Sequence, residues 1–300
     1  RTMLFNILEE EWDQELLDLF EVPRSMLPVV CENASDFGRT KLLGGEINIG
    51  GVAGDQQAAL IGQCCFHPGE VKSTYGTGCF MIANTGNEAL FSKNRLLTTI
   101  GYKIDGQTTF ALEGSIFVAG SAIQWLRDGL GFFKDSAETE DMAKLSSADS
   151  KVMVIPALTG LGAPYWDPDA RGAIFGLTRD TGKEDITRAT LEAIAYQSRD
   201  LLEAMNKDNA TFQKLMIDGG MVVNNWFSQK LSNTLGIEVI RPKIIETTSL
   251  GAAFLAGLQA GIFEDFKSLE NSKKIDRTFI PIEEESRYEE WKEAVSRTLT

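Results

Sequence analysis

The chain has 300 residues, of which 43% are hydrophobic and 24% charged, a balance typical of a globular protein with one large or two ordinary domains. Its net charge of −14 disfavours electrostatic binding to nucleic acid or anionic lipid, because both attract positive surfaces. No apolar run reaches the roughly 18 residues of a membrane span, and the N-terminal segment is acidic almost at once, so we expect no membrane span and a cytoplasmic location.

Cysteine and histidine usage limits the chemistry further. The four cysteines, Cys31, Cys64, Cys65 and Cys79, form no C-x-x-C pair, which favours reduced thiols in a cytoplasmic protein. A single histidine, His67, lies beside Pro68 and Gly69 in a predicted loop. The sequence therefore offers neither a zinc site nor a Ser-His-Asp triad.

The first 70 residues predict two helices. The pattern is helical over residues 6–20, followed by a turn at 22–28 and a Gly-rich, polar connection over 31–50. A second helix is expected to start at Asp55 and to stop at residues 67–70, where Pro and Gly interrupt the pattern.

Strand patterns follow. Residues 71–86 predict two extended runs that meet at the glycine-rich residues 75–78. Residues 96–116 predict a hairpin that turns at Asp105–Gly106, and a helix is expected over 117–130.

The remainder alternates between strand and helix. Residues 151–158 form a continuous apolar run, as in a strand buried on both faces. Further strands are predicted at residues 212–218 and 237–242, and helices at residues 183–205, 221–236, 249–261 and 283–299. Antiparallel strands followed by alternation predict a mixed α/β layer with helices on a central sheet. We place a domain boundary near residues 62–70, where helix gives way to hairpins.

Three glycine-rich junctions could carry chemistry. Residues 75–78, "YGTG", could bring N–H groups to a phosphate or could be an ordinary hairpin turn. Residues 216–225, "MIDGGMVVNN", have the strand–glycine–helix order that suits a nucleotide, although they match neither the Rossmann nor the P-loop motif and their glycines could simply make a tight turn. Residues 160–180 form a long loop whose aromatic residues argue against disorder.

Asp55 in "GVAGDQQAAL" has two interpretations. An Asp before a helix is a preferred N-cap, whose oxygen accepts an N–H two or three residues further on. A carboxylate exposed at a helix start between small residues could also act as a general base or face a metal ion, and the two interpretations do not exclude each other. Periodicity does not separate the two interpretations.

Seven stretches, in order along essentially the whole chain, resemble the FGGY carbohydrate kinases, which belong to the actin/hexokinase-like ATPases. They are "GVAGDQQAAL", "STYGTGCF", "LLTTI", "ALEGSIFVAGSAIQWLRD", "PALTGLGAPYWDPDARGAIFGLTR", "DGGMVVNNWF" and "TSLGAAFLAGL". The residues around Asp55 and the Gly-Thr-Gly turn look like those of the glycerol-specific branch.

The resemblance implies a kinase that transfers a phosphoryl group from ATP to glycerol with Mg²⁺, yielding sn-glycerol 3-phosphate. By its match to the family motif, Asp55 would be the catalytic base and would face the metal, Gln56 would hydrogen-bond glycerol, and Phe80 would pack against its carbon backbone. The positions that match the family's ATP contacts are Gly76, Thr77, Gly120, Gln124, Gly220 and Asn224. The resemblance also implies an actin-like (ribonuclease H-like) fold and a homodimer or homotetramer.

The chain departs from the family pattern at its start. The family's N-terminal phosphate loop and most glycerol-pocket residues have no counterpart here, so we expect a fragment with little or no activity alone. By the resemblance, residues 1–64 would be the end of the first domain with the catalytic-base segment, and 65–300 the nucleotide-binding second domain.

Regulation is expected to differ as well. Glu46 occupies the place where some bacterial members carry an Arg that binds fructose 1,6-bisphosphate, and no His precedes His67 for activation by phosphorylation. We therefore expect both controls to be absent.

Other functions stay open at this stage. The chain could belong to an FGGY kinase for another polyol or sugar, or to a non-catalytic actin-like module that binds ATP. It could also be a structural domain with nucleotide affinity only. Asp55, Gln56 and Phe80 favour a polyol kinase, because a pure nucleotide switch has no use for a polyol-binding set.

Overall fold

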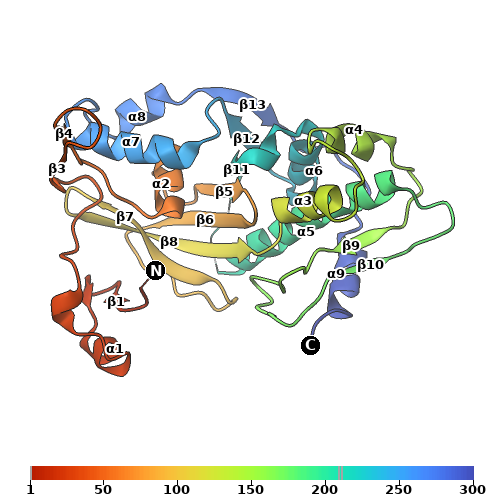
Figure 1. The fold of residues 1–300 in the computed structure, drawn as a ribbon, viewed down its shortest axis with the longest axis horizontal. Helices are drawn as coiled ribbons and strands as arrows, with labels where there is room; N and C mark the ends of the chain where they lie inside the picture. The colour runs from red at the N-terminus through yellow and green to blue at the C-terminus, as the bar shows by residue number, and fades with distance from the viewer. Residues whose placement is uncertain (1, 209, 211) are drawn as a thin grey trace.

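The computed structural model describes residues 2–208, 210 and 212–300, and its centre is a mixed sheet of seven strands. The strand order is β13-β12-β11-β5-β6-β8-β7, in which β11 runs parallel to β5 and β12 while the other neighbours are antiparallel (Figure 1). The strands are β5 (Val71–Tyr75), β6 (Cys79–Gly86), β7 (Leu97–Ile104), β8 (Gln107–Ile116), β11 (Lys214–Asp218), β12 (Glu238–Pro242) and β13 (Ile275–Phe279). The predicted mixed sheet and the hairpin at Asp105–Gly106 are confirmed.

Helices cover both faces of this sheet (Figure 1). One face packs against α2 (Asp55–Gly62), α7 (Thr247–Gln259) and α8 (Phe266–Ser272). The other packs against α3 (Gly120–Asp128), α4 (Glu138–Leu145), α5 (Lys183–Lys207) and α6 (Asn225–Leu235). Strand alternation explains this division, because Val71 and Tyr75 of β5 point into the α5 side while Ile82 of β6 points into the α2 side.

Helices α2 and α7 cross with their backbones in direct contact. A Cβ atom on Gly251 of α7 would lie 1.8 Å from the carbonyl oxygen of Ala58, and one on Gly62 would lie 2.0 Å from that of Thr247. Only glycine permits this approach, because no side-chain rearrangement moves a backbone carbonyl out of the way. The crossing fixes α2, and therefore Asp55 at its start, against the sheet.

A third layer lies beyond α5. It consists of β9 (Met153–Ile155), β10 (Ala173–Phe175) and α9 (Tyr288–Ser296), whose Trp291 is buried and donates from its indole N–H to Val154 O at 3.1 Å. The prediction of a strand buried on both faces over residues 151–158 is confirmed for β9, where Val154 and Ile155, on opposite faces, are both buried. The strand is shorter than predicted because Pro156 ends it after three residues, and among the described residues it pairs with β10, outside the seven-stranded sheet.

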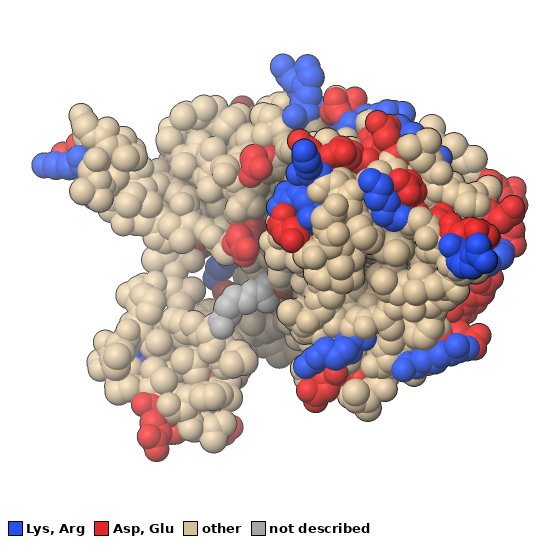
Figure 2. All heavy atoms as spheres, turned by 45° about the vertical axis from the view of Figure 1, so that its right-hand side comes forward, with Lys and Arg blue, Asp and Glu red and all other residues tan. Residues whose placement is uncertain are grey.

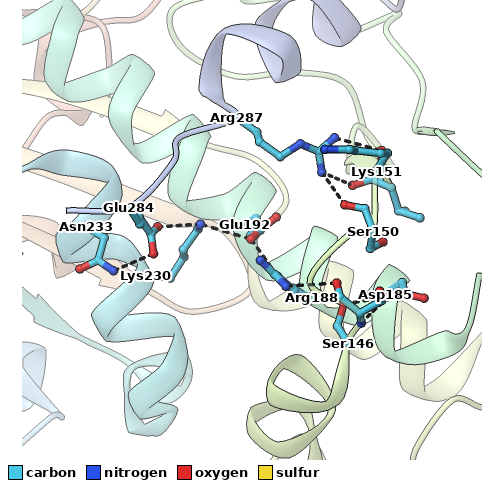
Figure 3. Close-up of polar contacts among 12 residues, drawn as sticks. Ser146, Ser150, Lys151, Asp185, Arg188, Glu192, Lys230, Asn233, Glu284 and Arg287 are labelled. Carbon is cyan, nitrogen blue, oxygen red and sulfur yellow. Dashed lines mark hydrogen bonds and ion pairs between the residues drawn. The ribbon is translucent and has the colours of Figure 1, made fainter. Parts of the chain in front are cut away.

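The segment before α9 is fixed by polar contacts (Figure 3). The guanidinium of Arg287 donates to the carbonyl oxygens of Ser150 and Lys151, both at 3.0 Å. The carboxylate of Glu284 lies 2.8 Å from the buried ammonium of Lys230 on α6. These contacts tie the C-terminal segment to two elements that are distant in the sequence.

Asp200 on α5 holds the outer layer from within. Its two carboxylate oxygens accept the hydroxyls of Tyr165 at 2.8 Å and of Tyr288 at 2.5 Å. Burial raises the pKa of Asp200 to about 6, although both tyrosine hydrogen bonds oppose the shift.

The pH dependence of stability should reflect Asp200. The pKa of Asp200 in the folded chain lies above the roughly 3.9 of an unfolded Asp. The Asp200 carboxyl group therefore makes its full contribution to the free energy of unfolding below about pH 3.9, and this contribution is lost as the pH rises through 6. Relative to Asp200→Asn, the wild-type free energy of unfolding should fall by roughly 3 kcal/mol between about pH 4 and pH 7. Urea unfolding at several pH values measures this difference. Asp180→Asn, at an exposed loop carboxylate, is the control, and a difference between wild type and Asp200→Asn that does not vary with pH would contradict the prediction.

The prediction of one helix over residues 6–20 is wrong. The segment forms a small hairpin of β1 (Phe5–Asn6) and β2 (Glu11–Trp12), and only then α1 (Gln14–Leu19), which Asp13 caps by accepting the N–H of Leu16. A positive φ of 56° at Glu10 breaks the helical path. The 3-10 turn Arg24–Met26 and the short strands β3 (Arg39–Thr40) and β4 (Ile47–Asn48) follow. In Figure 1 the part around α1 extends from the body, whereas β3 and β4 lie beside the end of α7.

The surface mixes both signs of charge. Lys and Arg side chains are interspersed with Asp and Glu over the described residues of the face in Figure 2. Within the described parts of the chain, none of the helices has the length and apolar character to cross a membrane. All four cysteines are free thiols, and three of them are buried.

Candidate active site

A cavity of about 490 Å³ lies between the β5–β6 turn, the start of α3, the start of α4 and the turn after β11. All six positions predicted as nucleotide contacts line it, namely Gly76, Thr77, Gly120, Gln124, Gly220 and Asn224. The first two glycine-rich junctions, which are about 140 residues apart in the sequence, therefore meet at one cavity. Its wall also includes apolar Ile123 and Leu191 and polar Arg127.

The turn after β5 is shaped by hydrogen bonds from the start of α3. The carbonyl oxygen of Thr77 accepts the N–H groups of Ala119 and Ser121, both at 3.0 Å, and that of Gly76 accepts the N–H of Gly120 at 2.9 Å. A Cβ on Gly120 would lie 2.5 Å from Gly76 O. The helix thus begins directly against the turn, with its positive dipole end at the cavity.

The second junction packs against the first. Gly219 has a φ of 91°, and a Cβ there would lie 2.5 Å from Tyr75 O. The chain continues as the 3-10 turn Gly220–Val223, and Asn224 then caps α6 by accepting the N–H of Phe227 at 2.9 Å. The predicted helix over 221–236 therefore starts at Asn225, because the left-handed Gly219 and the Asn224 cap separate it from β11.

The remaining wall was missed by the sequence analysis. Residues 135–137, 139 and 140, which lead into and begin α4, line the cavity, and two of them are bonded to the start of α6. Asn224 Nδ2 donates to Thr139 Oγ1 at 3.1 Å, and Glu140 Oε2 accepts the N–H of Asn225 at 2.8 Å. The cluster of Glu and Asp at the start of "ETEDMAKL" is the helix-start signal that could have revealed α4.

Asp55 is exposed at the first position of α2, and the interpretation of Asp55 as the N-cap is wrong. Gly54 occupies the cap position without a side-chain bond, while Asp55 Oδ1 accepts the N–H of the next residue, Gln56, at 2.9 Å. The Thr248 hydroxyl of α7 lies 3.5 Å from the Asp55 carbonyl oxygen. The carboxylate is held at the helix start and faces solvent.

Gln56 lies beneath Asp55 and is 6% exposed. Its Oε1 accepts a hydrogen bond from Lys72 Nζ, and its Nε2 lies 3.4 Å from Asp55 Oδ2. Lys72 on β5 is fully buried and also donates to Thr74 Oγ1 at 2.9 Å. Burial lowers the pKa of Lys72, while the nearby carboxylates of Asp218 and Glu113 counteract this shift.

Phe80 lies on the same face of the sheet as Lys72. It pairs in register with Thr74 of β5 and with Ser115 of β8, and 36% of its side chain is exposed. The long loop 160–180 reaches this row, because the N–H of Ala163 donates to Ser115 O at 2.9 Å. Asp55, Gln56 and Phe80 therefore belong to one side of the sheet, and β5 leads from that side to the cavity.

The described residues hold no ready-made cluster of metal ligands. Among the described residues, no group of three or more His, Cys, Asp or Glu could hold a metal ion. A lone exposed carboxylate such as Asp55 nevertheless suits Mg²⁺, which commonly takes one or two protein carboxylates together with substrate phosphates and water.

The sheet, its flanking helices and a cavity at the glycine turns define the chain as an α/β protein of the actin-like ATPase fold. Residues 1–62 match the N-terminal domain and residues 71–260 the C-terminal domain of the FGGY family of carbohydrate kinases. The chain therefore belongs to the FGGY family.

Individual relatives agree with this assignment. The glycerol kinase of Alcanivorax borkumensis is 58% identical and glycerol kinase 1 of Pseudomonas aeruginosa 55% identical, each over 99% of this chain and 61% of its own length. The structure of Plasmodium falciparum glycerol kinase with ADP is similar with a TM-score of 0.89 and 36% identity, over 99% of this chain and 62% of that one. The chain thus spans about three fifths of these relatives.

Proposed function

We propose that this chain is part of an ATP-dependent kinase that phosphorylates glycerol to sn-glycerol 3-phosphate. The observation that carries the proposal is the convergence of six predicted nucleotide contacts on one cavity, with Asp55 and Phe80 on the adjoining face of the sheet. The relatives named glycerol kinase, with 55% and 58% identity, support glycerol over other polyols.

ATP would bind in the cavity. Gly76 and Thr77 lie at the end of β5 beside the start of α3, where the positive end of the helix dipole favours a phosphate although the first N–H groups of the helix are bonded to the turn. Gly220 and Asn224 line the cavity next to apolar Met221, where the adenosine would lie. Small residues at the turn leave room for the phosphates to approach the backbone.

Asp55 would orient the attacking glycerol hydroxyl and accept its proton as the loose transition state of phosphoryl transfer resolves. Phe80 presents an exposed ring suited to the carbon side of a triol. Gln56 is buried with both ends of its amide engaged, so its contact with glycerol would add to or replace the long contact of 3.4 Å between its Nε2 and Asp55 Oδ2.

Mg²⁺, held by Asp55 together with ATP phosphates, would neutralise charge that develops on the transferred group. We also propose a cytoplasmic protein that forms homodimers or homotetramers, with domains divided at residues 64 and 65. Glu46 forms an ion pair of 2.6 Å with Arg39, which supports the proposed absence of fructose 1,6-bisphosphate binding there.

Turnover of alternative acceptors by the complete protein tests the proposal. With ATP, glycerol should be phosphorylated far better than glyceraldehyde, erythritol or xylulose. Equal or better turnover of a sugar would favour another FGGY activity. ATP binding without turnover of any polyol would favour the non-catalytic module.

Gly120→Ala should weaken ATP binding by at least about tenfold, because its Cβ would collide with Gly76 O and displace the phosphate-side turn. Calorimetric titration of the complete protein with ATP measures the change. Leu130→Ala, at an exposed position just beyond α3, is the control and should leave the affinity unchanged. Unaltered ATP affinity in Gly120→Ala would place the nucleotide elsewhere.

A further inference from the structure

Lys72 is a buried lysine that takes part in none of the proposed contacts with ATP or glycerol. Its side chain is fully buried on β5, and its ammonium donates to Gln56 Oε1 and Thr74 Oγ1. Burying an ammonium is unfavourable unless its hydrogen bonds and counter-charges compensate. Asp218 and Glu113 supply the counter-charges. Lys72 therefore places a buried charge one side chain away from the exposed carboxylate of Asp55.

The donors and acceptors of the Gln56 amide indicate a role for this charge. A lysine ammonium has three donors and no acceptor, so the group that Gln56 turns toward Lys72 must be its carbonyl oxygen. The NH2 group of Gln56 then points the other way, toward Asp55 Oδ2 at 3.4 Å. The backbone N–H of the same residue holds Asp55 Oδ1 at 2.9 Å. Gln56 therefore holds both carboxylate oxygens, and Lys72 determines which end of the amide faces them.

We propose that Lys72 is a positioning residue, which acts through Gln56 to orient the Asp55 carboxylate for proton transfer. This inference rests on the proposed function of Asp55 as the base. Without Lys72, the Gln56 amide could rotate and present its oxygen to Asp55, which would repel the carboxylate from its working position. Small misplacements of a catalytic group lower turnover far more than they lower nucleotide binding.

Kinetics of Lys72→Met in the complete protein test the proposal. We expect kcat with glycerol to fall by about 10- to 100-fold while KM for ATP changes less than about threefold. Ser73→Ala is the matched control, because Ser73 is a buried polar neighbour on the opposite face of β5, bonded to Cys79 Sγ at 3.0 Å. Ser73→Ala should keep kcat within about twofold. Equal losses of kcat in both variants would overturn the proposal.

A double-mutant cycle separates positioning from a general loss of structure. If Lys72 acts through Gln56, adding Lys72→Met to Gln56→Met should lower kcat no further, whereas independent effects would multiply. Multiplying effects would overturn the proposal. Should Lys72→Met not fold, Gln56→Glu retains a partner for the ammonium but turns an oxygen toward Asp55, and kcat should fall at least about tenfold. Unchanged kcat in Gln56→Glu would overturn the proposal.

A readout without catalysis distinguishes this proposal from the proposed function. In protein labelled with 15N-glutamine, the Gln56 side-chain amide, assigned by its loss in Gln56→Met, should exchange its protons at least about tenfold faster in Lys72→Met than in the wild type. Faster exchange in Lys72→Met together with an inactive wild type would refute glycerol phosphorylation but would support the positioning of Gln56 by Lys72. Equal exchange in Lys72→Met and in an active wild type would overturn the positioning role alone.

Discussion

Asp55→Asn in the complete protein is expected to lower kcat for glycerol phosphorylation by about 10²- to 10⁴-fold, the range that a general base contributes. Asn preserves the shape of the side chain and can still accept the N–H of Gln56, so the start of α2 should not change. It cannot take up the hydroxyl proton. Affinity for ATP measured without Mg²⁺ should stay within about threefold, because the cavity wall does not include Asp55.

Steady-state kinetics and calorimetry with ATP measure the two effects separately. Asp105→Asn is a suitable control, because Asp105 is exposed in a tight turn with a φ of 52°, a conformation that Asn adopts readily. Near-normal turnover in Asp55→Asn would limit Asp55 to a structural role at the start of α2.

Gly251→Ala is expected to destabilise the protein by about 3 kcal/mol, the upper end of the cost of overpacking a core. Its Cβ would lie 1.8 Å from Ala58 O, so α2 and α7 would have to separate. Separation would expose Leu60 and Leu255, which are fully buried where these helices cover the sheet. Because α2 carries Asp55, kcat should fall as well.

Urea unfolding of the complete protein, followed by fluorescence and circular dichroism, measures the loss of stability. Gly45→Ala is the matched control, because a Cβ at Gly45 meets no atom within 4 Å. Gly45→Ala should leave the unfolding midpoint unchanged. Equal midpoints for Gly251→Ala and the wild type would mean that the two helices tolerate a wider spacing.

The sequence predicted the fold well where local patterns decide it. Alternation of apolar residues and the Asp105–Gly106 turn gave the β7–β8 hairpin, and helical spacing gave α5. Where the secondary structure predicted from the sequence was wrong, contacts between residues distant in the sequence decided the structure. Glu10 bonds to Lys103 and Thr108, 93 and 98 residues away, and such partners stabilise a hairpin where the local pattern indicated a helix.

Glycine spacing and the resemblance to the family predicted part of the candidate site from the sequence. The turns at Gly76 and Gly220 were found, since each combines a strand end with glycine. Two parts were not found. The wall at Thr139 depends on a contact with Asn224, 85 residues away, and Lys72 looks like an ordinary polar residue of an alternating strand.

Strand β5 joins both halves of the proposed site in one uninterrupted stretch of backbone. Lys72 supports the carboxylate segment, and four residues later Gly76 opens the turn at the cavity. At about 3.3 Å per residue, the strand sets a distance of roughly 13 Å between Lys72, on the side of the proposed glycerol site, and Gly76, at the proposed ATP site. Inserting one residue between them would increase this distance and would also reverse the face on which Lys72 lies. This segment should therefore tolerate substitutions far better than changes in length.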